Sequence, residues 1–76
     1  YLDSIVGKKL YKKEQERLIN KIGLKDSRGR LQKSISLLNE YLKTNKIPYI
    51  IISKRVKRNK KLHTIWMVDS LIIIEN

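Results

Sequence analysis

The chain has 76 residues, which is one small domain, and 41% of them are hydrophobic, enough for a folded core. It has no cysteine and one histidine, which excludes disulfides, thiolate metal sites and a metal site made of imidazoles alone. No apolar run is long enough to cross a bilayer, and the N-terminus lacks the charged-then-apolar order of a signal peptide.

Positive charge dominates the composition. Eighteen Lys and Arg residues face 7 Asp and Glu residues, for a formal net charge of +11. A field of this strength favours a polyanion as partner, which means DNA, RNA or an anionic membrane. Isoleucine, lysine and asparagine are abundant throughout, as in proteins from AT-rich genomes, so the placement of the cations is more informative than their number.

The first nine residues are ambiguous, and a clear helix follows them. The segment LDSIV (residues 2–6) fits the end of a helix that stops at Gly7, and KLY (residues 9–11) fits a short extended piece. A helix is predicted from Lys12 to Ile22, where apolar residues recur at helical spacing. Gly23 supplies the left-handed residue that ends it, and Leu24 suits the apolar contact just beyond.

A longer helix is predicted from about Arg28 to Asn45, after the polar turn KDSRGR. Asp26 or Ser27 is the expected N-cap. Leu37 falls outside the apolar stripe and is expected either to touch a partner or to be half exposed. The stripe follows i, i+4, i+7, i+11 spacing and consists of Leu31, Ile35, Leu38 and Leu42.

Two strands follow and are predicted to form a hairpin. YIIIS (residues 49–53) is rich in β-branched residues, and LHTIWMV (residues 62–68) alternates between two faces. Tyr49 and Trp66 are expected to fill the core rather than to stack on unpaired bases, and His63 is expected to have no special role. The run KRVKRNKKLH (residues 54–63) joins the strands as a long, charged tip.

The stretch EQERLINKIGLKDSRGRLQKSISLLNEYLKTNKI (residues 14–47) resembles a helix-turn-helix. With the hairpin added, Leu10 to Val68 resembles a winged-helix domain. The resemblance implies an α+β fold, a small winged helix-turn-helix with two or three helices packed on a β-hairpin that carries a basic wing. The family's additional first helix corresponds to residues 2–6 or lies upstream, and residues 1–76 are expected to be one domain cut from a larger protein.

The resemblance also implies a mode of binding to double-stranded DNA. The N-terminal half of the second helix would enter the major groove, and the wing would follow the backbone or the minor groove. The expected helix contacts are Ser27, Arg28, Arg30, Gln32, Lys33 and Ser36. The expected wing contacts are Lys54, Arg55, Lys57, Arg58, Lys60 and Lys61.

Two biological roles fit this mode of binding: a transcription regulator, or an appended DNA-binding domain of a replication or DNA-processing protein from a virus or mobile element. One alternative is a single-stranded DNA or RNA binder, which needs aromatic side chains on a basic face. Another is a protein-interaction module, which needs an exposed apolar patch. The end of the chain, DSLIIIEN, starts either a further strand or a helix capped by Asp69. Its apolar residues suggest a packing partner at Leu71, Ile72, Ile73 and Ile74.

Other classes of function lack the residues they need. No catalytic set, glycine-rich phosphate loop or metal-ligand cluster occurs in the sequence, so we expect no enzymatic activity in this fragment, no metal and no cofactor, while the activity of a larger parent protein stays open. No helix pairs a basic face with a broad apolar one, so we expect no membrane partner. The absence of cysteine fits a reducing compartment, and a cytoplasmic location with access to nucleic acid is expected.

Overall fold

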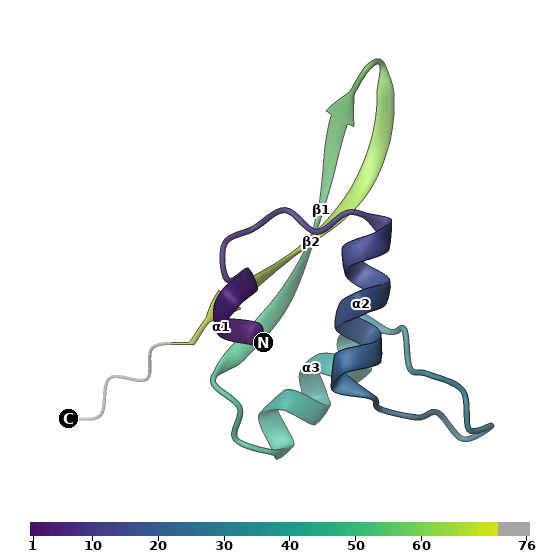
Figure 1. Ribbon diagram of the computed structural model, residues 1–76, viewed down its shortest axis with the longest axis vertical. Helices are drawn as coiled ribbons and strands as arrows, with labels where there is room; N and C mark the ends of the chain where they lie inside the picture. Colours follow the sequence, from purple (N-terminus) through teal and green to yellow (C-terminus); the bar gives the residue numbers. More distant parts are fainter. Residues whose placement is uncertain (72–76) are drawn as a thin grey trace.

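The computed structural model describes residues 1–71, and within them three helices precede one antiparallel hairpin (Figure 1). The elements are α1 (Leu2–Ile5), α2 (Lys12–Ile22), α3 (Ile35–Thr44), β1 (Tyr49–Arg58) and β2 (Lys61–Ser70). The α+β class is therefore confirmed, and the order of elements is compatible with a winged-helix-like layout. The predicted packing role of Ile72, Ile73 and Ile74 lies outside the described residues.

The N-terminal third of the chain follows the sequence pattern closely. Helix α2 has the predicted bounds, and Gly23 ends it with φ of 67° while its N–H donates to the Ile19 carbonyl. The predicted extended piece is also present: the backbones of Leu10 and Trp66 exchange two hydrogen bonds, of 2.8 and 3.0 Å. The segment before α2 therefore lies along the outer edge of β2.

The second predicted helix was wrong in its first third, because α3 begins at Ile35 and not near Arg28. A connecting loop (residues 23–34) takes its place. The carboxylate of Asp26 accepts the N–H groups of Arg28 and Arg30, at 2.9 and 3.0 Å, and Gly29 adopts a positive φ of 77°. These local bonds close a tight turn that competes with the helix. Asp26 thus caps a turn, and Ser34 precedes α3.

The predicted long tip of the hairpin was also wrong, because the strands continue through most of the basic run. Pairing extends from Tyr49–Ser70 to Arg58–Lys61, which leaves a turn of two residues. Asn59 and Lys60 have φ values of 52° and 63°, the combination that a type I′ turn requires. This turn matches the twist of paired strands, so backbone pairing reaches the end of the hairpin. At the other end, Asp69 belongs to β2 and caps no helix.

The core lies between the three helices and one face of the hairpin. Trp66 is 8% exposed and Tyr49 packs partly against the core, so both have the predicted packing role. Leu37 is exposed and lies outside the core, in line with its place outside the apolar stripe. The most deeply buried side chains of this core are Leu10, Leu18, Leu38, Leu42, Ile51 and Val68.

Candidate nucleic-acid interface

The distal half of the hairpin, which we call the hairpin arm (residues 54–64), projects beyond the helices at the top of Figure 1. It contains no Asp or Glu. All six of its cationic residues are exposed, and five of them lie in paired strands rather than in a loop. The six are Lys54, Arg55, Lys57, Arg58, Lys60 and Lys61.

The cations occupy both faces of the hairpin arm. Paired residues of an antiparallel ladder share a face, and alternate residues along a strand share it too. Arg55 and Lys57 therefore lie on the face that carries Trp66 and Val68 nearer the core. On the opposite face are Lys54, Arg58 and Lys61. The arm is a ribbon with positive charge on each side.

Acidic groups do not neutralise this charge within the described residues. Across residues 1–71, one ion pair forms, between Arg30 Nε and Asp26 Oδ2 at 3.5 Å. The nearest favourable contact of an arm cation is the Arg58 guanidinium over the Tyr11 ring, 5.7 Å from the ring centroid. The mutual repulsion of the arm cations is therefore left for an external anion to relieve.

Helix α2 holds the base of the hairpin arm. Gln15 Nε2 donates to the carbonyl oxygens of Leu10 and Thr64, both at 2.9 Å, which joins α2 to the edge of β2. The Tyr11 ring meets His63 edge-on, with centroids 6.4 Å apart. His63 is exposed in β2, so it is a hairpin residue as predicted, although it takes part in this junction. The arm is thus attached at two points, to Gln15 in α2 and to Tyr11 just before it.

The six residues predicted to lie on a groove-entering helix are not together on a helix. Five of them precede α3 in the connecting loop, and Ser36 alone lies in its first turn. Five of the six side chains are exposed, and Gln32 is half-buried. The residues in the connecting loop are Ser27, Arg28, Arg30, Gln32 and Lys33.

Two polar side chains of the connecting loop are already engaged. Gln32 Oε1 accepts the N–H groups of Lys33 and Ser34, both at 3.1 Å, so pairing of the Gln32 amide with a base edge competes with these bonds. The N–H of Arg30 is the main cause that lowers the pKa of the Asp26 carboxyl below its ordinary 3.8. Asp26 is therefore charged at neutral pH and offsets part of the loop's positive charge.

Helix α2 contributes a row of cations that the sequence reasoning missed. Lys13, Arg17 and Lys21 are exposed and recur at i, i+4 and i+8, on the side that faces away from the buried Ile19. The signal was present in the sequence as the polar face of an amphipathic helix. Glu14 and Glu16 are also exposed on α2, so this row of cations is accompanied by acidic groups. The exposed side of α3 is likewise mixed in charge. It includes Ser36, Leu37, Glu40, Lys43 and Thr44.

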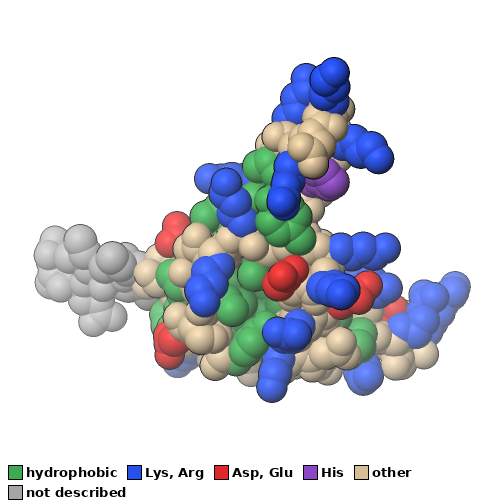
Figure 2. Space-filling view, turned by 45° about the horizontal axis from the view of Figure 1, so that its top comes forward, with side chains coloured by type: hydrophobic (Ala, Val, Ile, Leu, Met, Phe, Trp, Pro, Cys, Tyr) green, Lys and Arg blue, Asp and Glu red, His purple; other side chains and the backbone are tan. Residues whose placement is uncertain are grey.

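The basic regions bracket one side of the molecule. The hairpin arm and the connecting loop leave the body in different directions, with α2 between them (Figure 1). Figure 2 shows blue side chains at the end of the arm, on the loop at lower right, and on the surface between. The arrangement differs from the predicted pair of wing and helix start, because a loop and α2 take the place of the helix start.

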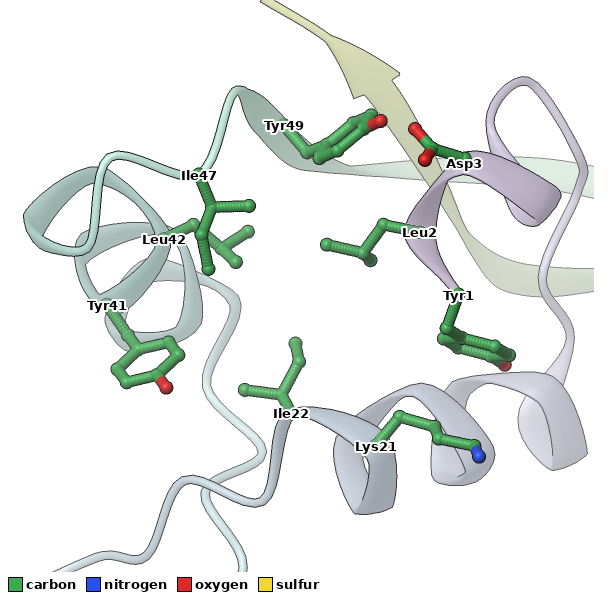
Figure 3. Close-up of a pocket in the computed structure, with 9 residues that line it drawn as sticks. All are labelled: Tyr1, Leu2, Asp3, Lys21, Ile22, Tyr41, Leu42, Ile47 and Tyr49. Carbon is green, nitrogen blue, oxygen red and sulfur yellow. The ribbon is translucent and has the colours of Figure 1, made fainter.

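A hollow of about 340 Å³ lies between the start of α1, the ends of α2 and α3, and the start of β1. Leu2, Ile22 and Ile47 point toward its centre (Figure 3). Lys21 reaches the Tyr1 ring at the rim, 5.6 Å from the ring centroid. A largely apolar lining with a single cation does not suit a polyanion.

No family model matches the chain, and neither the curated proteins nor the solved structures compared with it contain a match. Within residues 1–71, no three His, Cys, Asp or Glu side chains are grouped to hold a metal ion. Over the same residues, no helix has the length and apolar character needed to span a membrane.

Proposed function

We propose that the chain binds double-stranded DNA, with the hairpin arm in a groove and with the connecting loop and α2 on the neighbouring backbone. One observation carries the proposal: six exposed cations on a paired, two-residue-turn hairpin have no acidic partner among the described residues. Phosphates would relieve their repulsion, and the release of condensed counterions would drive association.

The two-faced distribution of charge favours a groove over a flat surface. In a groove, phosphates line both walls, so the cations on each face of the hairpin arm have an anion within reach. A flat anionic surface could contact only one face of the arm. The cations of the other face, either Arg55 and Lys57 or Lys54 and Lys61, would then point away from the anions. If roughly six phosphates are neutralised, affinity should fall about a thousandfold between roughly 50 and 200 mM salt.

The proposed contacts are mainly to the DNA backbone. Base readout in the major groove uses Arg, Lys, Gln or Asn presented on an inserted element, and the exposed side of α3 offers Lys43 near its C-terminal end. Contacts to phosphate position a protein without reading sequence. Weak sequence preference fits an appended domain of a DNA-processing protein better than a regulator that selects one site.

The test is a titration of labelled duplex and of single strand, followed by fluorescence anisotropy at two salt concentrations. We expect tighter binding to the duplex and a steep salt dependence. Changing Lys57, Arg58, Lys60 and Lys61 to Glu should abolish binding to all duplex sequences. A control variant with the same change of charge outside the proposed interface, Lys8, Lys9, Lys43 and Lys46 to Glu, should retain most of it.

Two results of this titration would overturn the proposal. Equal losses in the two charge-reversal variants would mean that net charge attracts DNA without any role for the hairpin arm. Tighter binding to the single strand would favour the alternative of a single-strand binder, for which Tyr11 and His63 offer aromatic surface beside the basic arm. Trp66 is unavailable for stacking on a base because it is buried in the core.

A further inference from the structure

The end of the hairpin arm carries an apolar side chain that contacts no core. Leu62 is 70% exposed, whereas the other large exposed hydrophobic residues of the described chain lie between 36% and 46%. It sits two residues after the turn, opposite Lys57 in the ladder and between Lys61 and His63 in sequence. Val56, the other apolar residue of the hairpin arm, is half-buried, so Leu62 is the one apolar side chain exposed among the arm's cations.

Leu62 differs from an ordinary exposed apolar residue in its position on a paired ribbon beside cations. Single exposed apolar side chains are ordinary on protein surfaces. Leu62, however, shares a ladder face with Arg55 and Lys57, and backbone pairing continues to Arg58–Lys61 just beside it. A paired ribbon presents such a side chain in a fixed direction, with a cation nearby to hold a phosphate.

We propose that Leu62 inserts as a wedge between stacked base pairs when the hairpin arm enters the minor groove. This inference rests on the proposed function and specifies its mode of binding. A two-stranded ribbon is wider than the minor groove of about 6 Å, so the groove must open to admit it. Apolar wedges that part a base step kink the duplex toward the major groove and provide that opening.

The proposal predicts a preference for duplex that is easily unstacked. A mismatch lowers the cost of parting the bases, so a short duplex with a central mismatch should bind more tightly than its matched counterpart. We expect a preference on the order of tenfold for the unchanged chain. A 2-aminopurine placed beside the mismatch should brighten on binding, because its fluorescence rises when it leaves the stack.

The deciding variant is Leu62→Ala, with Leu37→Ala as its matched control. Both leucines are exposed, so neither change should disturb the fold, which circular dichroism would verify. Leu62→Ala should lose the mismatch preference and the 2-aminopurine signal, and it should keep the steep salt dependence. Leu37→Ala should retain all three.

The wedge and the proposed function fail in different ways. If the unchanged chain binds matched duplex with a steep salt dependence but shows no mismatch preference, the wedge is refuted and the groove binding stands. The same holds if Leu62→Ala keeps the preference and the fluorescence change. If the unchanged chain binds no duplex of either kind, both proposals fall.

Discussion

Asn39 and Ile51 are joined by a two-way hydrogen-bonded bridge between α3 and the outer edge of β1. Asn39 Nδ2 donates to the Ile51 carbonyl at 2.9 Å, and the Ile51 N–H donates to Asn39 Oδ1 at 2.7 Å. Ile51 is 2% exposed, so its backbone groups have little access to water. The bridge therefore gives hydrogen-bond partners to the backbone N–H and C=O of Ile51 on the unpaired edge of β1. It also fixes α3 against the strand that continues into the hairpin arm.

Removing this bridge should destabilise the fold. Asn39→Leu leaves a buried N–H and a buried C=O without partners, which should lower the free energy of unfolding by about 1–3 kcal/mol. Urea unfolding followed by circular dichroism measures the change. Asn20→Ala is the control, because Asn20 donates to the Glu16 carbonyl on the exposed side of α2 and should change stability by less than about 0.5 kcal/mol. Equal losses would contradict the role given to the bridge.

The parts of the fold that were predictable are those governed by local periodicity. Helix α2 and its glycine stop followed from apolar spacing and from the need for a left-handed residue at Gly23. The burial of Trp66 followed from strand alternation. The bridge from Asn39 was not predictable, because an asparagine on a helix looks like any other polar surface residue until its partner strand is placed.

The parts that were missed depend on competition between local structures. Because the apolar stripe begins at Leu31, the helix was predicted to start near Arg28. In the structure, hydrogen bonds from Arg28 and Arg30 to the Asp26 carboxylate hold residues 26–30 in a turn instead. In the hairpin, a run of like charges resembled a loop, although lysine and arginine can line both faces of an exposed ribbon. Asn59 and Lys60 were the available signal, as a two-residue turn with positive φ.

The cations on α2 should contribute to DNA binding. Changing Lys13 and Arg17 to Gln removes two proposed phosphate contacts, so the slope of log affinity against log salt should fall by about two. The same charge change at Lys43 and Lys46, at the end of α3, should alter the slope by less than about half a unit. Anisotropy titrations over a salt series give both slopes. A larger effect at Lys43 and Lys46 would shift the interface to α3 and contradict the arrangement proposed above.

The turn of the hairpin arm should be improved by glycine. Lys60 has a φ of 63°, which costs a residue with a side chain about 1–2 kcal/mol, while glycine adopts it freely but loses more backbone entropy. Lys60→Gly should therefore stabilise the arm by about 0.5 kcal/mol, seen as slower amide exchange in residues 54–64. The salt slope should fall by at most about one, since one cation is removed. Faster exchange in the arm would contradict the type I′ geometry.

The connecting loop should open in acid. The folded pKa of Asp26 is lowered from 3.8, chiefly by the N–H of Arg30, so its stabilising effect is fully present above 3.8 and is lost as pH falls through the lower folded value. The amide signals of Arg28 and Arg30 should follow this titration by NMR. Asp26→Asn keeps an acceptor oxygen without the titration, so its profile should be flat over the same range. A midpoint at or above 3.8 in the unchanged chain would contradict the turn.

The two faces of the hairpin arm should contribute comparably if the arm lies in a groove. Changing Arg55 and Lys57 to Gln removes both cations of one face, and changing Lys54 and Lys61 to Gln removes two of the three on the other, with the same loss of charge. Each pair should reduce the salt slope by about two, because phosphates on both walls are in contact. Arg58 is kept in both variants, since its contact with Tyr11 supports the junction with α2. Anisotropy over a salt series again supplies the slopes. A full effect from one pair and none from the other would place the arm flat against a single strand's backbone, which would remove the geometric basis for groove entry and for the wedge.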